Sequence, residues 1–139
     1  MDVLVLIGRI LFSARFLGSS VGHLTQTDAM AGYTRSKGVP AARAAVLGSG
    51  VLQLLGGLSV LLGVWHDLGA LLLVAFLVPT AVLMHAFWKE TDPMARQNEM
   101  IQFLKDMALA GAALALFALF AYAGRDLGLT ITGPLFNLD

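Results

Sequence analysis

The sequence predicts an all-α polytopic membrane protein, folded as an antiparallel bundle of four transmembrane helices. Of its 139 residues, 58% are hydrophobic and only 13% are charged, and the mean hydropathy is +0.79. Soluble domains average roughly 45–50% apolar and about 25% charged residues, so both values indicate a lipid environment. Polar connections separate four apolar segments, each long enough for the roughly 20 residues of helix that cross a bilayer.

The composition also excludes several functions. Nine Lys and Arg residues balance nine Asp and Glu residues, so the chain has no basic excess with which to bind nucleic acid. Because cysteine is absent, the chain has no disulfide, no thiolate ligand for an iron–sulfur cluster and no catalytic thiol. The sequence shows no phosphate-binding loop, nucleophile–base pair or metal-binding motif, so we expect no catalytic residues and no autonomous enzymatic activity.

The predicted spans cover about residues 3–24, 44–64, 68–88 and 100–123 of a single domain, residues 1–139. Arg9 and Arg15 interrupt the first segment where a signal peptide needs an uncharged core, so this segment is predicted to be a mature helix. Residues 65–67 leave only a tight turn between the second and third spans, which makes these spans antiparallel neighbours.

The polar connections, residues 25–43 and 89–99, predict the orientation of the chain. The first connection is expected to hold a short interfacial helix over Ala29–Lys37. The connections and the adjoining helix ends carry most of the basic residues: Arg35, Lys37, Arg43, Lys89, Arg96 and Lys105. The opposite side has Arg125 and the terminal amine, with Arg9 nearby. The positive-inside rule therefore predicts that both connections are cytoplasmic and both termini extracytoplasmic.

Two arginines on one face of the first span are the strongest functional signal. At about 100° per residue, Arg9 and Arg15 fall on the polar half of this helix, with Arg15 near its middle. A charge at the bilayer centre costs about 2.5–3.5 kcal/mol on insertion scales, so such a residue is paired, lines a cavity or contacts a ligand. The first three spans contain no acidic residue that could pair with either arginine.

Asp106, in the fourth span, is the acid closest in depth to Arg15. Since the first and fourth spans are antiparallel, the two residues differ by about 7–8 Å along the membrane normal, and we predict an ion pair between them. Gln53 lies near mid-membrane in the second span and is predicted to face Arg15. Two interpretations remain open. The arginines hold the bundle together through these groups, backbone carbonyls and surface acids, or they bind an anionic or carbonyl-bearing ligand or a partner's carboxylate.

Histidines and small residues complete the set of candidate positions. His23 and His85 lie near the same membrane face, so bis-imidazole ligation of haem is geometrically conceivable, but no motif supports haem or a metal and we expect neither. Hydrogen bonding within the bundle is the preferred role of His85, followed by contact with a quinone or lipid head group. Ser49, Gly56 and Gly63 recur every seven residues in the second span and predict close helix packing.

Several short motifs follow one another in a characteristic order and spacing. They are Gly8-Arg9, Val21-Gly22-His23-Leu24, Lys37-Gly38-Val39-Pro40, Gln53-x-x-Gly56-Gly57, His85-x-x-Trp88, Gln97-x-Glu99-Met100-x-x-Phe103-Leu104-Lys105-Asp106 and Gly133-Pro134-x-x-Asn137-Leu138-Asp139. Together they resemble the DoxX family of small four-helix bacterial membrane proteins over nearly the whole chain. The family often has Glu at the position of Gln53 and Asn at that of Asp106, so the distribution of intramembrane acids differs here.

The resemblance implies a bacterial inner-membrane protein linked to redox chemistry, since some relatives are subunits of thiosulfate:quinone oxidoreductase and others accompany enzymes that handle thiol stress or superoxide. We therefore expect an accessory or anchor subunit, at most a quinone-linked oxidoreductase subunit, that binds quinone or anionic lipid. The candidate binding residues are Arg9, Arg15, Gln53 and His85. Expected partners are the lipid bilayer, other membrane or peripheral redox subunits and a second copy of the chain. The alternatives are a small-molecule transporter or channel, in which Asp106 titrates, and a structural protein that recruits partners.

Overall fold

A computed structural model of the protein describes residues 1–138. These residues form five α-helices and two short 3-10 helices, without any strand. The elements are α1 (Asp2–Thr25), α2 (Thr27–Ser36), α3 (Ala42–Leu62), α4 (His66–Met84), η1 (Phe87–Lys89), α5 (Pro93–Ala123) and η2 (Gly124–Asp126). Four segments are long and apolar enough to cross a membrane: Asp2–Thr25, Ala42–Leu62, His66–Lys89 and Pro93–Asp126. The predicted all-α membrane architecture is therefore confirmed.

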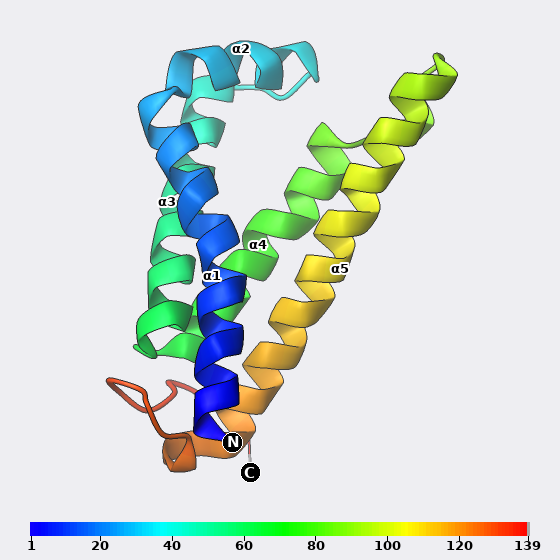
Figure 1. Ribbon diagram of the computed structural model, residues 1–139. Helices are drawn as coiled ribbons and strands as arrows, with labels where there is room; N and C mark the ends of the chain where they lie inside the picture. Colours follow the sequence, from blue (N-terminus) through cyan, green and yellow to red (C-terminus); the bar gives the residue numbers. More distant parts are fainter. Residues whose placement is uncertain (139) are drawn as a thin grey trace.

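The four long helices are antiparallel neighbours arranged in a row. α1 packs against α3, α3 against α4, and α4 against α5. Figure 1 shows that the pair α1 and α3 lies close to the pair α4 and α5 where the two termini meet, and that the pairs diverge toward the end that carries α2. We call these two ends of the molecule the terminal end and the α2 end. The divergence leaves room between the pairs at the α2 end.

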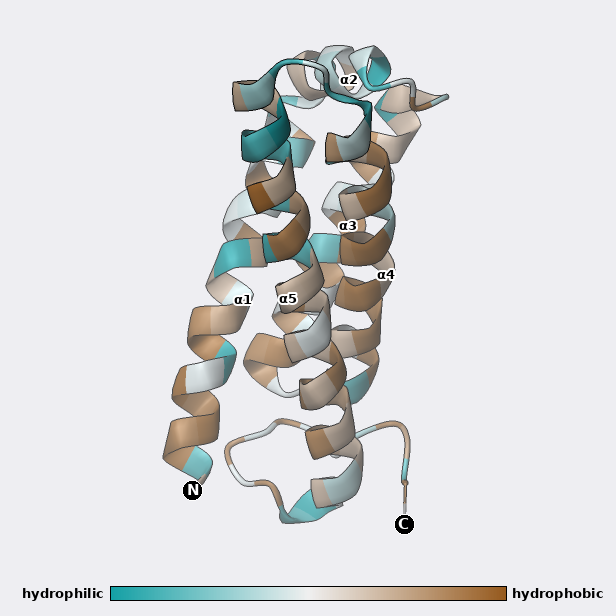
Figure 2. Ribbon diagram, turned by 90° about the vertical axis from the view of Figure 1, so that its right-hand side faces the viewer, coloured by the Kyte–Doolittle hydropathy of each residue, from teal (hydrophilic) through white to brown (hydrophobic). Residues whose placement is uncertain are grey.

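The short helix α2 lies across the ends of α1 and α3 (Figure 1). Its buried face includes Ala31, which packs with Ala42 and Val46 at the start of α3. The interfacial helix expected over Ala29–Lys37 is thus present, over Thr27–Ser36. Figure 2 shows hydrophilic residues gathered at α2 and the start of α5, and again near the C-terminal segment, with a largely hydrophobic middle section. This distribution matches a protein that spans a bilayer.

Two helix boundaries differ from the sequence-based expectation. α5 begins at Pro93 rather than at about residue 100, because the Asp92 carboxylate caps the helix by accepting a hydrogen bond from the Ala95 N–H at 2.8 Å. The proline in the first turn favours the same start. α4 ends at Met84, and Phe87–Lys89 forms a separate 3-10 turn. The polar residues between Pro93 and residue 99 are therefore helical. The prediction of a loop over residues 89–99 was wrong for this part of the chain.

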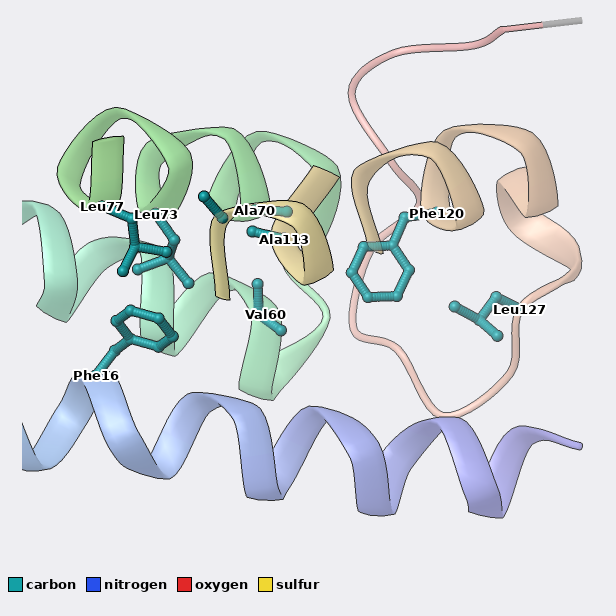
Figure 3. Close-up of a cluster of buried hydrophobic side chains, with 9 residues drawn as sticks. Phe16, Val60, Ala70, Leu73, Leu77, Ala113, Phe120 and Leu127 are labelled. Atoms are coloured by element: carbon teal, nitrogen blue, oxygen red, sulfur yellow. The ribbon is translucent and has the colours of Figure 1, made fainter. Parts of the chain in front are cut away.

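A hydrophobic core fills the region in which the four long helices meet. Phe16 of α1 lies opposite Leu73 and Leu77 of α4, Val60 of α3 lies deeper toward the terminal end, and Phe120 of α5 follows it (Figure 3). All five side chains are almost completely buried. Because lipid is as apolar as these side chains, close van der Waals packing holds the helices together rather than the exclusion of water.

Gly56 lies at a close contact between α3 and α4. A Cβ atom at this position would lie 2.8 Å from Leu73 Cγ and 3.0 Å from the Gly69 carbonyl oxygen. At Gly48, on the same helix, a Cβ atom would have no neighbour within 4 Å. The two glycines therefore provide a matched pair, one at a helix contact and one in open space.

We predict that Gly56→Ala lowers the free energy of unfolding by about 1–3 kcal/mol, because the added methyl group forces the two backbones apart. Gly48→Ala is expected to leave stability unchanged or to raise it by up to about 1 kcal/mol, through the higher helix propensity of alanine. Reversible unfolding of the purified variants in mixed detergent micelles measures both changes. Equal stability of the two variants would show that α3 and α4 can repack freely.

Candidate functional site

Arg9 is fully buried, and its hydrogen bonds end on backbone carbonyls. Nε donates to the Val60 carbonyl at 2.7 Å, Nη2 to the Leu61 carbonyl at 2.7 Å and Nη1 to the Leu129 carbonyl at 2.8 Å. Val60 and Leu61 belong to the last turn of α3, where carbonyls lack partners within the helix. One guanidinium therefore joins α1, the end of α3 and the C-terminal segment.

Asp67 holds the same C-terminal segment from the other side. Its carboxylate is fully buried and accepts hydrogen bonds from the Leu135 N–H at 2.9 Å and the Phe136 N–H at 2.6 Å. Asp67 was expected in the tight turn over residues 65–67, and it lies in the first turn of α4. Gly63 makes the turn between α3 and α4 possible, because its φ of 69° is left-handed and a Cβ atom would lie 2.7 Å from Nη2 of Arg9. The terminal end is thus closed by internal polar contacts.

A cleft of about 580 Å³ lies at the α2 end, between the α1–α3 pair and the α4–α5 pair. Helices α1 to α5 all contribute to its walls. Its apolar lining includes Phe16, Leu52, Phe76, Leu77 and Leu83. Its polar lining includes Arg15, Ser19, His23, Tyr33, Ser49, Thr80, His85, Gln102, Lys105 and Asp106. The cleft thus offers a mixed surface to an amphiphilic molecule.

Arg15 lines this cleft with an exposed side chain. Within residues 1–138, its guanidinium has no hydrogen bond and no carboxylate oxygen within 4 Å. The predicted ion pair between Arg15 and Asp106 is therefore not formed, and the two groups act on each other only at longer range. Figure 1 shows that α5 diverges from α1 toward the α2 end, and the prediction from depth along the membrane normal did not take this lateral separation into account.

A chain of polar contacts leads from the buried wall of the cleft to the α2 end. Asp106 Oδ2 lies 3.6 Å from His85 Nε2, and His85 Nδ1 lies 2.7 Å from Glu99 Oε2. The other Glu99 oxygen lies 2.7 Å from Lys37 Nζ, which also approaches Glu90 at 3.4 Å. The hydrogen bond to Glu99 raises the pKa of Lys37. His85 thus hydrogen bonds within the bundle, as the sequence analysis preferred.

Local structure explains why these groups meet. Glu99 and Asp106 are seven residues apart in α5, which places them on one face of the helix, two turns from each other. His85 directly follows the last turn of α4, and its ring lies between the two carboxylates. The spacing of the two acids was visible in the sequence, but the predicted loop over 89–99 concealed that Glu99 is helical.

Gln53 does not face Arg15 as predicted. It is fully buried in α3, does not line the cleft, and neither atom of its amide has a hydrogen-bond partner in the described part of the chain. Of the four candidate binding residues, the structure brings only Arg15 and His85 to the cleft. His23 is added to the site, with Nδ1 2.8 Å from Ser49 Oγ. No group of three potential metal ligands occurs among residues 1–138.

Four membrane-length helices, a capping interfacial helix and an intramembrane cleft define a small multi-pass membrane protein, whose environment is the lipid bilayer. The chain belongs to the DoxX family, whose model matches residues 4–86. It is also 30% identical over 114 residues to the inner membrane protein YphA of Escherichia coli (strain K12), covering 82% of this chain and 81% of that protein. No solved structure matches the chain.

Proposed function

We propose that this protein is an accessory or anchor subunit of a redox assembly in the bacterial inner membrane. In this proposal, the cleft binds a quinone, or an anionic lipid with a comparable polar head, and Arg15 holds that head. The observation that carries the proposal is a cationic side chain at mid-helix that faces a cleft of about 580 Å³ without a carboxylate partner among residues 1–138. An intramembrane charge in this situation is a functional-site candidate.

The contrast between the two arginines supports this assignment. Arg9 uses its donors on three internal carbonyls, so it stabilises the fold and has little left to offer a ligand. Within residues 1–138, Arg15 donates to no other group, so its donors are available to the cleft. A guanidinium presents N–H groups in a planar fork that matches a carboxylate, a phosphate or a carbonyl oxygen. In this proposal, the two interpretations left open by the sequence apply to different arginines: Arg9 holds the bundle together and Arg15 binds the ligand.

The dimensions and the lining of the cleft fit a quinone head group. Its volume falls within the roughly 300–1,000 Å³ of typical small-molecule sites. Phe76 and Leu83 provide apolar contact for a ring and its tail, and His23 provides a polar group near the ring oxygens. Arg15 would stabilise the negative charge that develops on a reduced quinone. In this proposal, the electrons that reduce the quinone come from a partner subunit.

Binding measurements on the full chain test this proposal. We predict that wild-type protein in phosphatidylcholine nanodiscs binds decyl-ubiquinone, and that Arg15→Gln weakens binding about tenfold or more, because a charge-assisted hydrogen bond is lost. Because Arg15 has no hydrogen bond or ion pair within residues 1–138, the variant should unfold like the wild type. Arg96→Gln, which removes an exposed arginine outside the cleft, is the matched control.

The same titration with phosphatidylglycerol distinguishes the two ligand sources. Tighter binding of the quinone supports a redox role, whereas selective enrichment of the anionic lipid supports an anchoring role at the same site. Absence of saturable binding of both molecules, or equal affinities of Arg15→Gln and wild type, would refute the proposed site.

A further inference from the structure

We infer that Asp106, His85 and Glu99 form a proton-exchange path between the cleft and the water at the α2 end. The path deepens the proposed function and rests on it for the choice of ligand. It favours a head group whose oxygen gains or loses a proton, as the hydroxyl of a hydroquinone does, over a lipid phosphate.

The geometry provides one group at each step of the path. Asp106 is 5% exposed and lines the cleft, so its carboxylate is the inner end. His85 follows at 3.6 Å, a separation that a side-chain movement of a few tenths of an ångström reduces to hydrogen-bond length. Glu99 accepts from the other ring nitrogen at 2.7 Å and is partly exposed, so its carboxylate is the outer end. The imidazole has one nitrogen for each carboxylate, as proton transfer through a histidine requires.

The proton transfers balance without any change in electron count. The O–H bond of a bound hydroquinone breaks and an O–H bond forms on the Asp106 carboxylate. Asp106 passes this proton to Nε2 of His85, while the proton on Nδ1 moves to the Glu99 carboxylate and then to water. The original tautomer is restored when Nε2 releases its proton to water and Nδ1 takes up a proton from water. The hydroquinone anion stays beside the Arg15 guanidinium, which stabilises its negative charge.

Charged or titratable groups from α1, α2, α5 and the segment before α5 surround the path, whereas α3 contributes only uncharged residues to the cleft. The charged or titratable groups are Arg15 and His23 of α1, Tyr33 and Lys37 of α2, Glu90 between η1 and α5, and Lys105 of α5. Lys37 and Tyr33 both contact the Glu99 oxygen that faces away from His85, at 2.7 and 3.4 Å. These two groups hold the carboxylate in position and leave its second oxygen to the ring.

The position of Asp106 also bears on ligand choice. A carboxylate in the cleft wall repels a phosphate, which is permanently anionic, whereas a neutral quinone or hydroquinone does not meet this repulsion. Asp106, which exchanges protons with water along the path, can take up the proton that a bound hydroquinone releases. A phosphodiester head group has no proton to exchange near neutral pH, so a proton path would not act on it.

Infrared spectroscopy after a rapid pH jump tests the path on the full chain in nanodiscs. The carboxyl band of Asp106 is identified by subtracting the spectrum of Asp106→Asn. We expect the protonation change of Asp106 to slow about tenfold or more in Glu99→Gln and in His85→Gln, because each variant removes one transfer step. Glu90→Gln is the matched control, since this acid also contacts Lys37 but does not touch His85.

The outcomes separate this inference from the proposed function. Unchanged rates in both Glu99→Gln and His85→Gln overturn the path, even when decyl-ubiquinone binds as proposed. Slowed rates together with an absence of quinone binding support the path but overturn the proposed ligand. Slowing in Glu90→Gln as well would mean that the whole charged cluster, rather than this route, controls access to Asp106, and would also overturn the path.

Discussion

Replacing Arg9 with methionine is expected to lower the free energy of unfolding by about 3–5 kcal/mol. Methionine has a similar length but donates no hydrogen bond, so three carbonyls that now accept from the guanidinium lose their partner. In lipid, the carbonyls at the end of α3 find no water to replace it. Denaturant titration of the purified variant, followed by helix content, measures the loss.

Two further variants show whether the hydrogen bonds are responsible. Arg9→Lys retains the charge but cannot reach three separate carbonyls with one planar group, so we expect an intermediate loss. Arg96→Met removes an exposed arginine and should change stability by no more than about 0.5 kcal/mol. A stability of Arg9→Met equal to that of wild type would contradict the structural role of Arg9.

The second large effect is expected for Asp67→Ala, with a loss of about 2–4 kcal/mol of unfolding free energy. The substitution leaves the Leu135 and Phe136 N–H groups without their Asp67 acceptor and releases the C-terminal segment from the first turn of α4. Hydrogen exchange at these two amides should accelerate strongly, while exchange in the middle of α3 changes little.

Asp67→Asn is the informative comparison, because its amide keeps one acceptor oxygen. We expect slow exchange to persist at one of the two amides and a smaller loss of stability. Asp126→Ala, at an exposed acid of the same end, is the control. Protection of Leu135 and Phe136 that survives in Asp67→Ala would show that other contacts hold the segment.

The sequence was sufficient for the membrane architecture, because the length and apolarity of a span are local properties. The start of α5 was missed, since polar residues such as Arg96 and Glu99 in its first turns look like a loop when hydropathy alone is considered. The capping signal at Asp92 and Pro93 was present in the sequence and would have corrected the boundary.

The site was harder to predict from the sequence than the fold, because the site depends on how the helices are placed beside one another in the membrane. Depth along the membrane normal suggested a partner for Arg15, but the divergence of the helix pairs separates that arginine from Asp106. The acceptors of Arg9 are backbone carbonyls, which every residue has, so the side-chain pattern could not predict them. Only the spacing of Glu99 and Asp106 on one helix face was a usable signal.

The predicted orientation adds a direction to the proposed path. With both termini on the extracytoplasmic side, the α2 end faces the cytoplasm, so Glu99 would exchange protons with cytoplasmic water. Reporter fusions at the C-terminus that are active only in the periplasm, compared with fusions active only in the cytoplasm, test this orientation. A cytoplasmic C-terminus would place the outer end of the path in the periplasm.

The hydrogen bond from Arg9 to Leu129 joins groups 120 positions apart, which has a consequence for biosynthesis. The arginine enters the translocon early, when its last acceptor has not yet been translated. During synthesis, the two acceptors in α3 become available before Leu129 does. The third hydrogen bond of this guanidinium therefore forms only after the ribosome has passed α5.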